Sequence, residues 1–230
     1  MKLTSPFAAM AWAVGIGTAV AAISTSEAKR LSEAAEVVRV LRAPSGDGIP
    51  ATTWDKAECA AVIPGLKKAA FGIGGEFGRG VMSCRSGQTW SAPLFMELEK
   101  GSWGLQIGAT EIDLVLLVMN KEGARKLLAN KVNLGADASV AGGPVGRSAT
   151  ASTDAQLHAE ILSYSHSRGV FAGIDISGGV LRPDKDANAD VYGAEAKPDT
   201  IVFGTAKVPS EASAFVKALG TGAVGTSGVR

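Results

Sequence analysis

An acidic segment near the end of the chain has the residue types that bind calcium. In DKDANADVYGAE, residues 184–195, oxygen-bearing side chains occupy the first, third, fifth, seventh and twelfth places of a calcium loop, namely Asp184, Asp186, Asn188, Asp190 and Glu195. The sixth place holds Ala189, although the sharp turn of such a loop calls for glycine. The residues before it, ending at Pro183, predict a strand instead of the usual helix. The match is partial, and a polar surface loop over residues 182–193 is the alternative.

A glycine cluster suggests a phosphate-binding loop, but its spacing excludes one. Gly72 and Gly74 begin a G-x-G-x-x-G pattern, and Phe77 stands where the third glycine is needed. No predicted helix follows to offer its amino terminus to a phosphate group. The glycines therefore predict a bulged, strongly twisted hairpin that turns at residues 76–79.

No catalytic constellation can be assembled from the remaining side chains. The two histidines, His158 and His166, share one face of a predicted strand with Glu160, but this H-x-E fragment lacks the further ligands of a zinc enzyme. No serine lies in a G-x-S-x-G motif. We therefore expect a protein that is not an enzyme and that has no catalytic residue, cofactor or resident metal.

The first 28 residues have the features of a secretory signal peptide. Lys2 precedes an apolar run over residues 7–23, and small residues suited to cleavage follow. Cleavage after Ala21, Ala22 or Ala28 satisfies the small-residue requirement. A retained membrane anchor is the less favoured alternative, because glycines interrupt a run that only just reaches spanning length. We expect a periplasmic or secreted protein.

Export determines how the two cysteines are interpreted. In an oxidising compartment, Cys59 and Cys84 are expected to form a disulfide, since two thiols alone cannot complete a structural zinc site. The bridge would close a loop of about 25 residues and would stabilise the fold by about 3 kcal/mol in the chain-entropy model.

The charges nearly cancel, with 23 Lys and Arg against 22 Asp and Glu, so we expect no nucleic-acid partner. Residues 29–42 predict an amphipathic helix, because apolar residues recur there at helical spacing. Its apolar stripe could pack on the domain or lie on a lipid surface. Glu33 and Glu36 dilute the positive charge, which favours packing.

Short apolar runs between turn residues predict most of the remaining chain as strands. They cover residues 59–63, 68–75, 80–85, 90–97, 102–108, 111–119, 132–140, 156–165 and 169–177. Helices are predicted at residues 50–57, 121–129 and 209–219, with Asn120 and Ser210 as amino-terminal caps. This pattern predicts a single α+β domain with a mostly antiparallel, twisted or barrel-like sheet of about eight short strands and a few flanking helices. The expected organisation is a signal peptide at 1–28, a helical lead-in at 29–58, the domain at 59–220 and a disordered tail at 221–230.

Several motifs resemble the SYLF family of lipid-binding and actin-binding domains. They are AAVIPGLKKAAFGIGGEFGRGVM (60–82), WSAPLF (90–95), GLQIGATEIDLVLLVMN (104–120), LGADASVAGGPVG (134–146), YSHSRGVFAGIDISGGVL (164–181) and the ending at Asn188, Tyr192 and Gly193. They follow one another in consistent order over most of the chain.

The resemblance implies a non-enzymatic module that binds anionic phospholipids, including phosphoinositides, at a membrane surface. It implies lipid contacts through basic residues near the start of the domain, here Lys29, Arg30, Arg39, Arg42, Lys67 and Lys68. Because an exported protein would meet neither actin nor much phosphoinositide, an anionic bacterial lipid is the expected partner. The alternative is a structural or partner-binding envelope protein without direct lipid binding.

Overall fold

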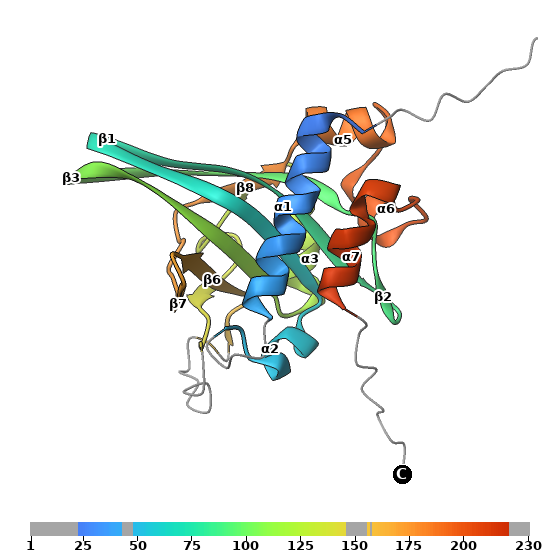
Figure 1. Ribbon diagram of the computed structural model, residues 1–230, viewed down its shortest axis with the longest axis horizontal. Helices are drawn as coiled ribbons and strands as arrows, with labels where there is room; N and C mark the ends of the chain where they lie inside the picture. Colours follow the sequence, from blue (N-terminus) through green and yellow to red (C-terminus); the bar gives the residue numbers. More distant parts are fainter. Residues whose placement is uncertain (1–22, 43–47, 146–155, 157, 221–230) are drawn as a thin grey trace, which may run out of the picture.

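The computed structural model of the chain describes residues 23–42, 48–145, 156 and 158–220. The predicted α+β class is confirmed: eight strands form one curled sheet, with helices packed on both faces (Figure 1). The strands are β1 (Cys59–Ser86), β2 (Thr89–Trp90), β3 (Leu94–Val118), β4 (Val132–Asn133), β5 (Val140–Gly142), β6 (Ile161–Ser167), β7 (Val170–Gly173) and β8 (Val180–Pro183). The helices are α1 (Thr25–Leu41), α2 (Ala51–Lys56), α3 (Lys121–Leu127), α5 (Lys185–Tyr192), α6 (Pro198–Phe203) and α7 (Ser213–Leu219), with a short 3₁₀ turn η2 (Ser210–Ala212) before α7.

Two very long strands replace the predicted short ones. The three strands expected between residues 59 and 85 are one continuous strand, β1, and the three expected between 90 and 119 form most of β3. The hairpin turn predicted at residues 76–79 is wrong, because Glu76 pairs with Lys100 and Arg79 with Glu97 in the β1–β3 ladder. Residues 99–101, which separate two of the predicted strands, pair within the same ladder.

Pro64 and Gly65 bend β1 without ending it. The ladder shifts register between Ile63 and Leu66, which marks a bulge. Gly65 has a φ of 56°, a conformation that side chains other than glycine rarely adopt. A bulge keeps the strand paired on both sides, which explains why residues typical of a strand end lie inside one.

The β1–β3 ladder folds back on itself, so the two ends of β1 meet. The Arg85 amide donates to the Glu58 carbonyl at 2.8 Å, and the Cα atoms of Cys59 and Cys84 lie 3.9 Å apart. The predicted disulfide between these cysteines is confirmed, although it joins two ends of one strand and not two different strands. In Figure 1 the bent part of the ladder extends to one side of the molecule.

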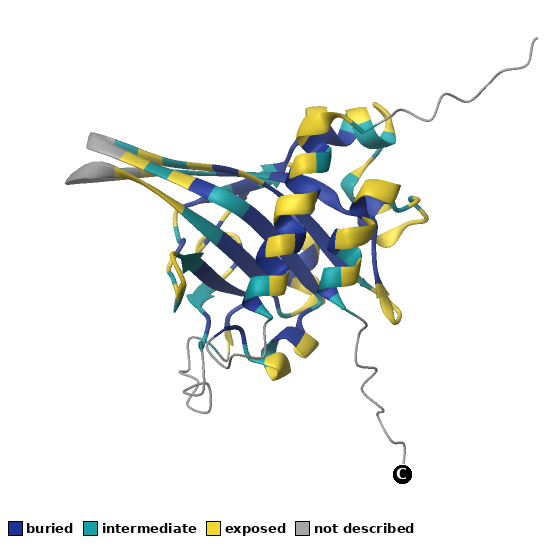
Figure 2. Cartoon of the chain, viewed as in Figure 1, coloured by how far each residue is buried: buried dark blue, intermediate teal, exposed yellow. Residues whose placement is uncertain are grey.

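Both faces of the sheet are buried, each by its own core. Along β1, Ala61 and Ile63 face a core that also contains Leu127 of α3, whereas Ala60 and Val62 face a second core covered by α1 and α7. Side chains alternate between these cores because successive strand residues point to opposite faces. Figure 2 shows the buried sheet beneath α1 and α7, whose outer sides are exposed.

The apolar stripe of α1 packs on the sheet. Leu31, Ala34 and Val38 are fully buried in the second core. The packing interpretation of the leading helix is therefore confirmed for its apolar side. The helix begins earlier than predicted, since Ser24 caps it and Thr25 is its first residue.

The rest of the chain extends this framework. β6 and β8 pair with the two halves of β3, so most of the strand predicted at 111–119 lies between β1 and β6. The predicted helices at 50–57, 121–129 and 209–219 are confirmed as α2, α3 and α7, and Asn120 caps α3 by accepting from the Gly123 amide at 2.7 Å. The cap predicted at Ser210 is wrong, because Ser210 lies within η2 and neither η2 nor α7 begins with a side-chain cap. The polar loop predicted over 182–193 is wrong, because β8 ends there and α5 begins.

Among the described residues, no helix has the length and apolar character needed to cross a bilayer. Most of the predicted signal peptide and the whole tail at 221–230 lie outside the described residues.

Truncation of Leu31 tests the packing of α1. Leu31→Ala should lower the free energy of unfolding by about 2–4 kcal/mol, because it leaves a cavity in a closed core. Chemical denaturation measures the change. Lys29→Ala, at a side chain that is 74% exposed on the same helix, should change stability by less than about 0.5 kcal/mol. Equal effects of the two substitutions would contradict the packing role.

Candidate functional site

A groove of about 610 Å³ lies between α1 and the bulged part of the β1–β3 ladder. The outer side of α1 forms one wall, and both halves of β1 contribute to the other. Among the described residues, four basic and four acidic side chains line it: Lys29, Arg30, Lys67, Arg79, Glu33, Glu36, Glu111 and Asp113. Because the signs balance, the groove can hold a polar group through individual contacts and has no strong net field.

The bulge positions one wall of this groove. The Gly65 amide donates to Asp113 Oδ1 at 3.0 Å, and Asp113 Oδ2 lies 3.4 Å from His166 Nδ1. These contacts fix the carboxylate of Asp113 between the bulge and β6. Lys67 follows the bulge by two residues and remains exposed.

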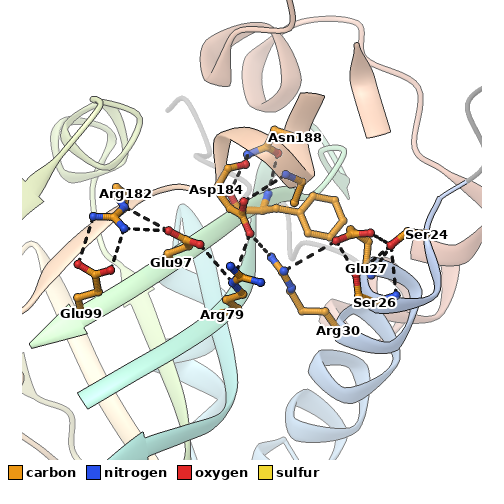
Figure 3. A network of polar contacts seen from close by, with 12 residues as sticks. Ser24, Ser26, Glu27, Arg30, Arg79, Glu97, Glu99, Arg182, Asp184 and Asn188 are labelled. Carbon is orange, nitrogen blue, oxygen red and sulfur yellow. Dashed lines mark hydrogen bonds and ion pairs between the residues drawn. The ribbon is translucent and has the colours of Figure 1, made fainter. Parts of the chain in front are cut away.

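Behind the groove, a chain of alternating charges joins α1 to the sheet (Figure 3). Arg30 is its centre: the guanidinium donates to Asp184 Oδ2 at 2.9 Å and lies 4.0 Å from Glu27. All three side chains are less than 10% exposed. A buried charge of this kind requires a partner, so Arg30 and Asp184 depend on each other for a stable position.

The charge chain continues across the sheet. Arg79 lies 3.9 Å from Asp184 and 3.2 Å from Glu97, and Arg182 contacts Glu97 at 3.1 Å and Glu99 at 2.8 Å. The hydrogen bond to Glu97 raises the pKa of Arg182 because it favours the charged guanidinium. The chain thus links α1, β1, β3, β8 and the start of α5.

The structure brings together three of the six basic residues predicted to contact lipid. Lys29, Arg30 and Lys67 line the groove. Lys29 is exposed and forms an ion pair with Glu33 at 3.4 Å, a kind of surface pair that contributes little to stability. Arg30 is committed to the buried ion pair with Asp184.

The other three lie outside this groove. Arg39 is exposed on α1 and pairs with Glu36 at 2.6 Å. Lys68 points to the opposite face of β1 from Lys67 and pairs with Glu76 at 3.2 Å.

Arg42 lies at the junction of α1 and α7. It donates to the carbonyls of Ala218 and Leu219 at 3.0 and 2.7 Å, and its guanidinium stacks over the Trp54 ring at 5.2 Å. Burial lowers its pKa from the ordinary value. It satisfies carbonyl groups that the end of α7 leaves unpaired. The lipid-binding role of the six residues stays a prediction.

The five calcium-ligand candidates do not wrap around a common centre. Residues 185–192 are helical, and Asp184 caps that helix by accepting from the Ala187 amide at 3.2 Å. Asn188 is buried and pairs with the Phe95 backbone through two hydrogen bonds of 2.9 and 2.8 Å. Within the described ranges, no group of three or more His, Cys, Asp or Glu side chains could hold a metal ion.

The predicted strand face with both histidines is also wrong. β6 begins only at Ile161, so His158 and Glu160 precede it. Glu160 binds the Lys126 ammonium at 2.8 Å, and His166 stacks on Phe171 with ring centroids 4.8 Å apart.

Arg79 and Phe77 line the groove but were not predicted as site residues. They were missed because the sequence predicted a turn, and not a strand, at residues 76–79. A signal was present, because glycines at 78 and 80 alternate with larger residues at the strand period of two. That alternation places Arg79 and Phe77 on one exposed face.

The buried ion pair can be tested by a nearly isosteric change. Asp184→Asn keeps a good helix cap but removes the charge that compensates Arg30, so the free energy of unfolding should fall by about 3 kcal/mol. Asp186→Asn, an exposed position on the same helix, should cost less than about 1 kcal/mol. Thermal and urea unfolding provide the comparison. An unaffected Asp184→Asn protein would show that the pair is not needed.

Comparison with known proteins identifies the family. The family model described as "Las17-binding protein actin regulator" matches residues 99–221. Protein YSC84 of Saccharomyces cerevisiae is 31% identical over 215 residues, covering 90% of this chain and 45% of that protein. The SH3 domain-containing YSC84-like protein 1 is 31% identical in Mus musculus, over 81% of this chain and 56% of that protein, and 33% identical in Xenopus laevis, over 74% and 52%.

The chain therefore spans about half the length of these curated relatives. The family model matches more than half of the chain. The yeast and mouse relatives are each 31% identical to it over 90% and 81% of its length. The chain belongs to the Ysc84 (SYLF) family.

Proposed function

We propose that this chain binds anionic phospholipid at a membrane surface, without catalysis, through the groove beside α1. The observation that carries the proposal is the exposed Lys67 ammonium, which forms no ion pair within the described part of the chain. A lipid phosphate offers the counter-charge that this lysine lacks.

Neighbouring groups support the same ligand. Lys29 lines the groove with an exposed side chain, and Arg79 is 56% exposed. Phe77 is 43% exposed. The Arg79 guanidinium lies over the Phe77 ring, 5.8 Å from the ring centre. An exposed aromatic ring beside basic groups suits the boundary between lipid head groups and acyl chains.

The proposed contact is peripheral and electrostatic. Since the apolar stripe of α1 is buried in the second core, only the polar side of that helix is available to a membrane. Glu33, Glu36 and Glu111 oppose the basic groups in the groove. Binding should therefore be modest, require anionic lipid and weaken with salt.

Export to the periplasm or beyond is part of the proposal. The disulfide supports it, because such bonds persist in oxidising compartments. The structure also favours the earlier cleavage sites, since a cut after Ala28 would remove the Ser24 cap and the buried Glu27.

The first residue of the mature protein tests which cleavage site is used. Intact-mass measurement of the exported protein should give Ala22 or Ile23 as the first residue, because either leaves the first turn of α1 whole. A mature chain that begins at Lys29 would contradict the argument from the cap.

A second candidate is a protein-binding role. The family description names a Las17-binding actin regulator, and several relatives carry SH3 domains in their names. A partner protein could dock on the same mixed-charge groove, since balanced charges also suit protein surfaces. A protein that keeps the groove intact but binds no lipid would favour this candidate.

Vesicle flotation tests the lipid proposal. The protein should float with phosphatidylcholine vesicles that contain phosphatidylglycerol and should not float with pure phosphatidylcholine. Lys29→Glu combined with Lys67→Glu should weaken binding about 30-fold or more, because each lysine near an anionic surface contributes about 1 kcal/mol.

Matched charge reversals control for net charge. Lys131→Glu combined with Lys197→Glu changes two exposed lysines away from the groove and should leave flotation nearly unchanged. Equal recovery with neutral and anionic vesicles, or equal losses in both double variants, would overturn the proposal.

A further inference from the structure

A second, smaller pocket of about 380 Å³ opens beside the disulfide. Cys59, Cys84 and Ala124 line it, and each is at most 1% exposed. Phe203, at the end of α6, also lines it and is 52% exposed. The pocket therefore combines small, buried apolar side chains with an accessible aromatic ring.

Basic groups gather on the same pocket. Lys121 and Arg125 lie four residues apart on α3, which places them on one side of the helix. Both are exposed, and neither side chain forms an ion pair or a hydrogen bond within the part of the chain that the structure describes. Two adjacent cations without partners are available to an anion.

Arg85 contributes a third cation to the lining. Its Nε donates to the Ala57 carbonyl at 2.7 Å and its Nη2 to the Trp54 carbonyl at 3.1 Å. Its Nη1 is buried and has no hydrogen-bond partner within the described residues. Buried polar atoms are normally paired, so this nitrogen is an unmet donor on a side chain that lines the pocket.

Acidic residues do little to neutralise these cations. Of the described residues that line the pocket, Glu58 alone is acidic. Glu122, the carboxylate next to Lys121 in sequence, instead lies 3.8 Å from Lys126, which also binds Glu160 at 2.8 Å. The pocket keeps a surplus of positive charge, unlike the balanced groove beside α1.

We infer that this pocket binds a single-chain amphiphilic anion, with a phosphate group between Lys121 and Arg125 and an alkyl stem along Phe203 and Ala124. Its volume lies within the range of small-molecule sites. Arg and Lys are the usual partners of phosphate oxygens, and the apolar lining gives the stem a dry surface. A free phosphate ion shares the charge but not the stem.

This inference does not rest on the proposed function. α3 and α6 cover the first core, whereas α1 and its groove belong to the other face of the sheet. Substitutions at one site therefore leave the other intact, and the two proposals fail separately.

Calorimetric titration with octyl phosphate below its micelle concentration tests the pocket. Inorganic phosphate and octyl glucoside are the two comparison ligands, one without the stem and one without the charge. The full chain should bind octyl phosphate more tightly than either. Amide signals of Cys84, Ala124 and Phe203 in NMR spectra should shift on binding.

Two variants separate the parts of the site. Lys121→Glu combined with Arg125→Glu should weaken octyl phosphate binding at least about tenfold, because both charge-assisted contacts are lost. Phe203→Ser should weaken octyl phosphate binding but leave inorganic phosphate binding unchanged. Lys131→Glu combined with Lys197→Glu, the matched charge control, should bind like the unmodified chain.

Three results would overturn the inference. The first is the absence of octyl phosphate binding. The second is equal binding by the Lys121 and Arg125 double variant, or shifts confined to the groove beside α1. The third is equal affinity for inorganic and octyl phosphate, which would show that the pocket binds free anions and that the alkyl stem contributes nothing to binding.

Discussion

The backbone of Gly80 passes over Val62 and Ile63 with no room for a side chain between them. A Cβ atom at Gly80 would lie 2.1 Å from the Val62 carbonyl oxygen, and one at Gly78 would lie 2.4 Å from the Ile63 side chain. This close approach lets the β1–β3 ladder fold back on itself. The disulfide and the hydrogen bond from Arg85 to Glu58 then hold the two ends of β1 together.

The other features follow from this folded ladder. Because β1 returns on itself, both of its halves can present residues to one groove, with Lys67 from the first half and Arg79 from the second. The same arrangement brings Arg79 within 3.9 Å of Asp184, the carboxylate that compensates the buried charge of Arg30. α1 is fixed against the ladder by packing on one side and by this charge chain at its start.

Local sequence features predicted the class of the fold and the Asn120 cap of α3, because strand alternation and capping act over short distances. The disulfide was predicted because the sequence has only two cysteines. Local sequence features did not predict the continuity of β1 and β3. Pro64, Gly65 and the later glycines are as typical of turns as of bulges, and only pairing with a distant strand decides between the two. The sequence also did not predict the ion-pair partner of Arg30, because 154 residues separate Arg30 from Asp184. Phe203 and Lys121 are likewise distant in the sequence, and the sequence did not predict that they line one pocket.

A comparison of two glycine substitutions tests the folded ladder most directly. Gly80→Ala should lower the free energy of unfolding by about 2 kcal/mol or more, because the new methyl group collides with the backbone of Val62. Gly101→Ala, in β3 with nothing within 4 Å of its added Cβ, should be neutral or slightly stabilising. A Gly80→Ala protein as stable as Gly101→Ala in urea unfolding would contradict the close approach on which the structure depends.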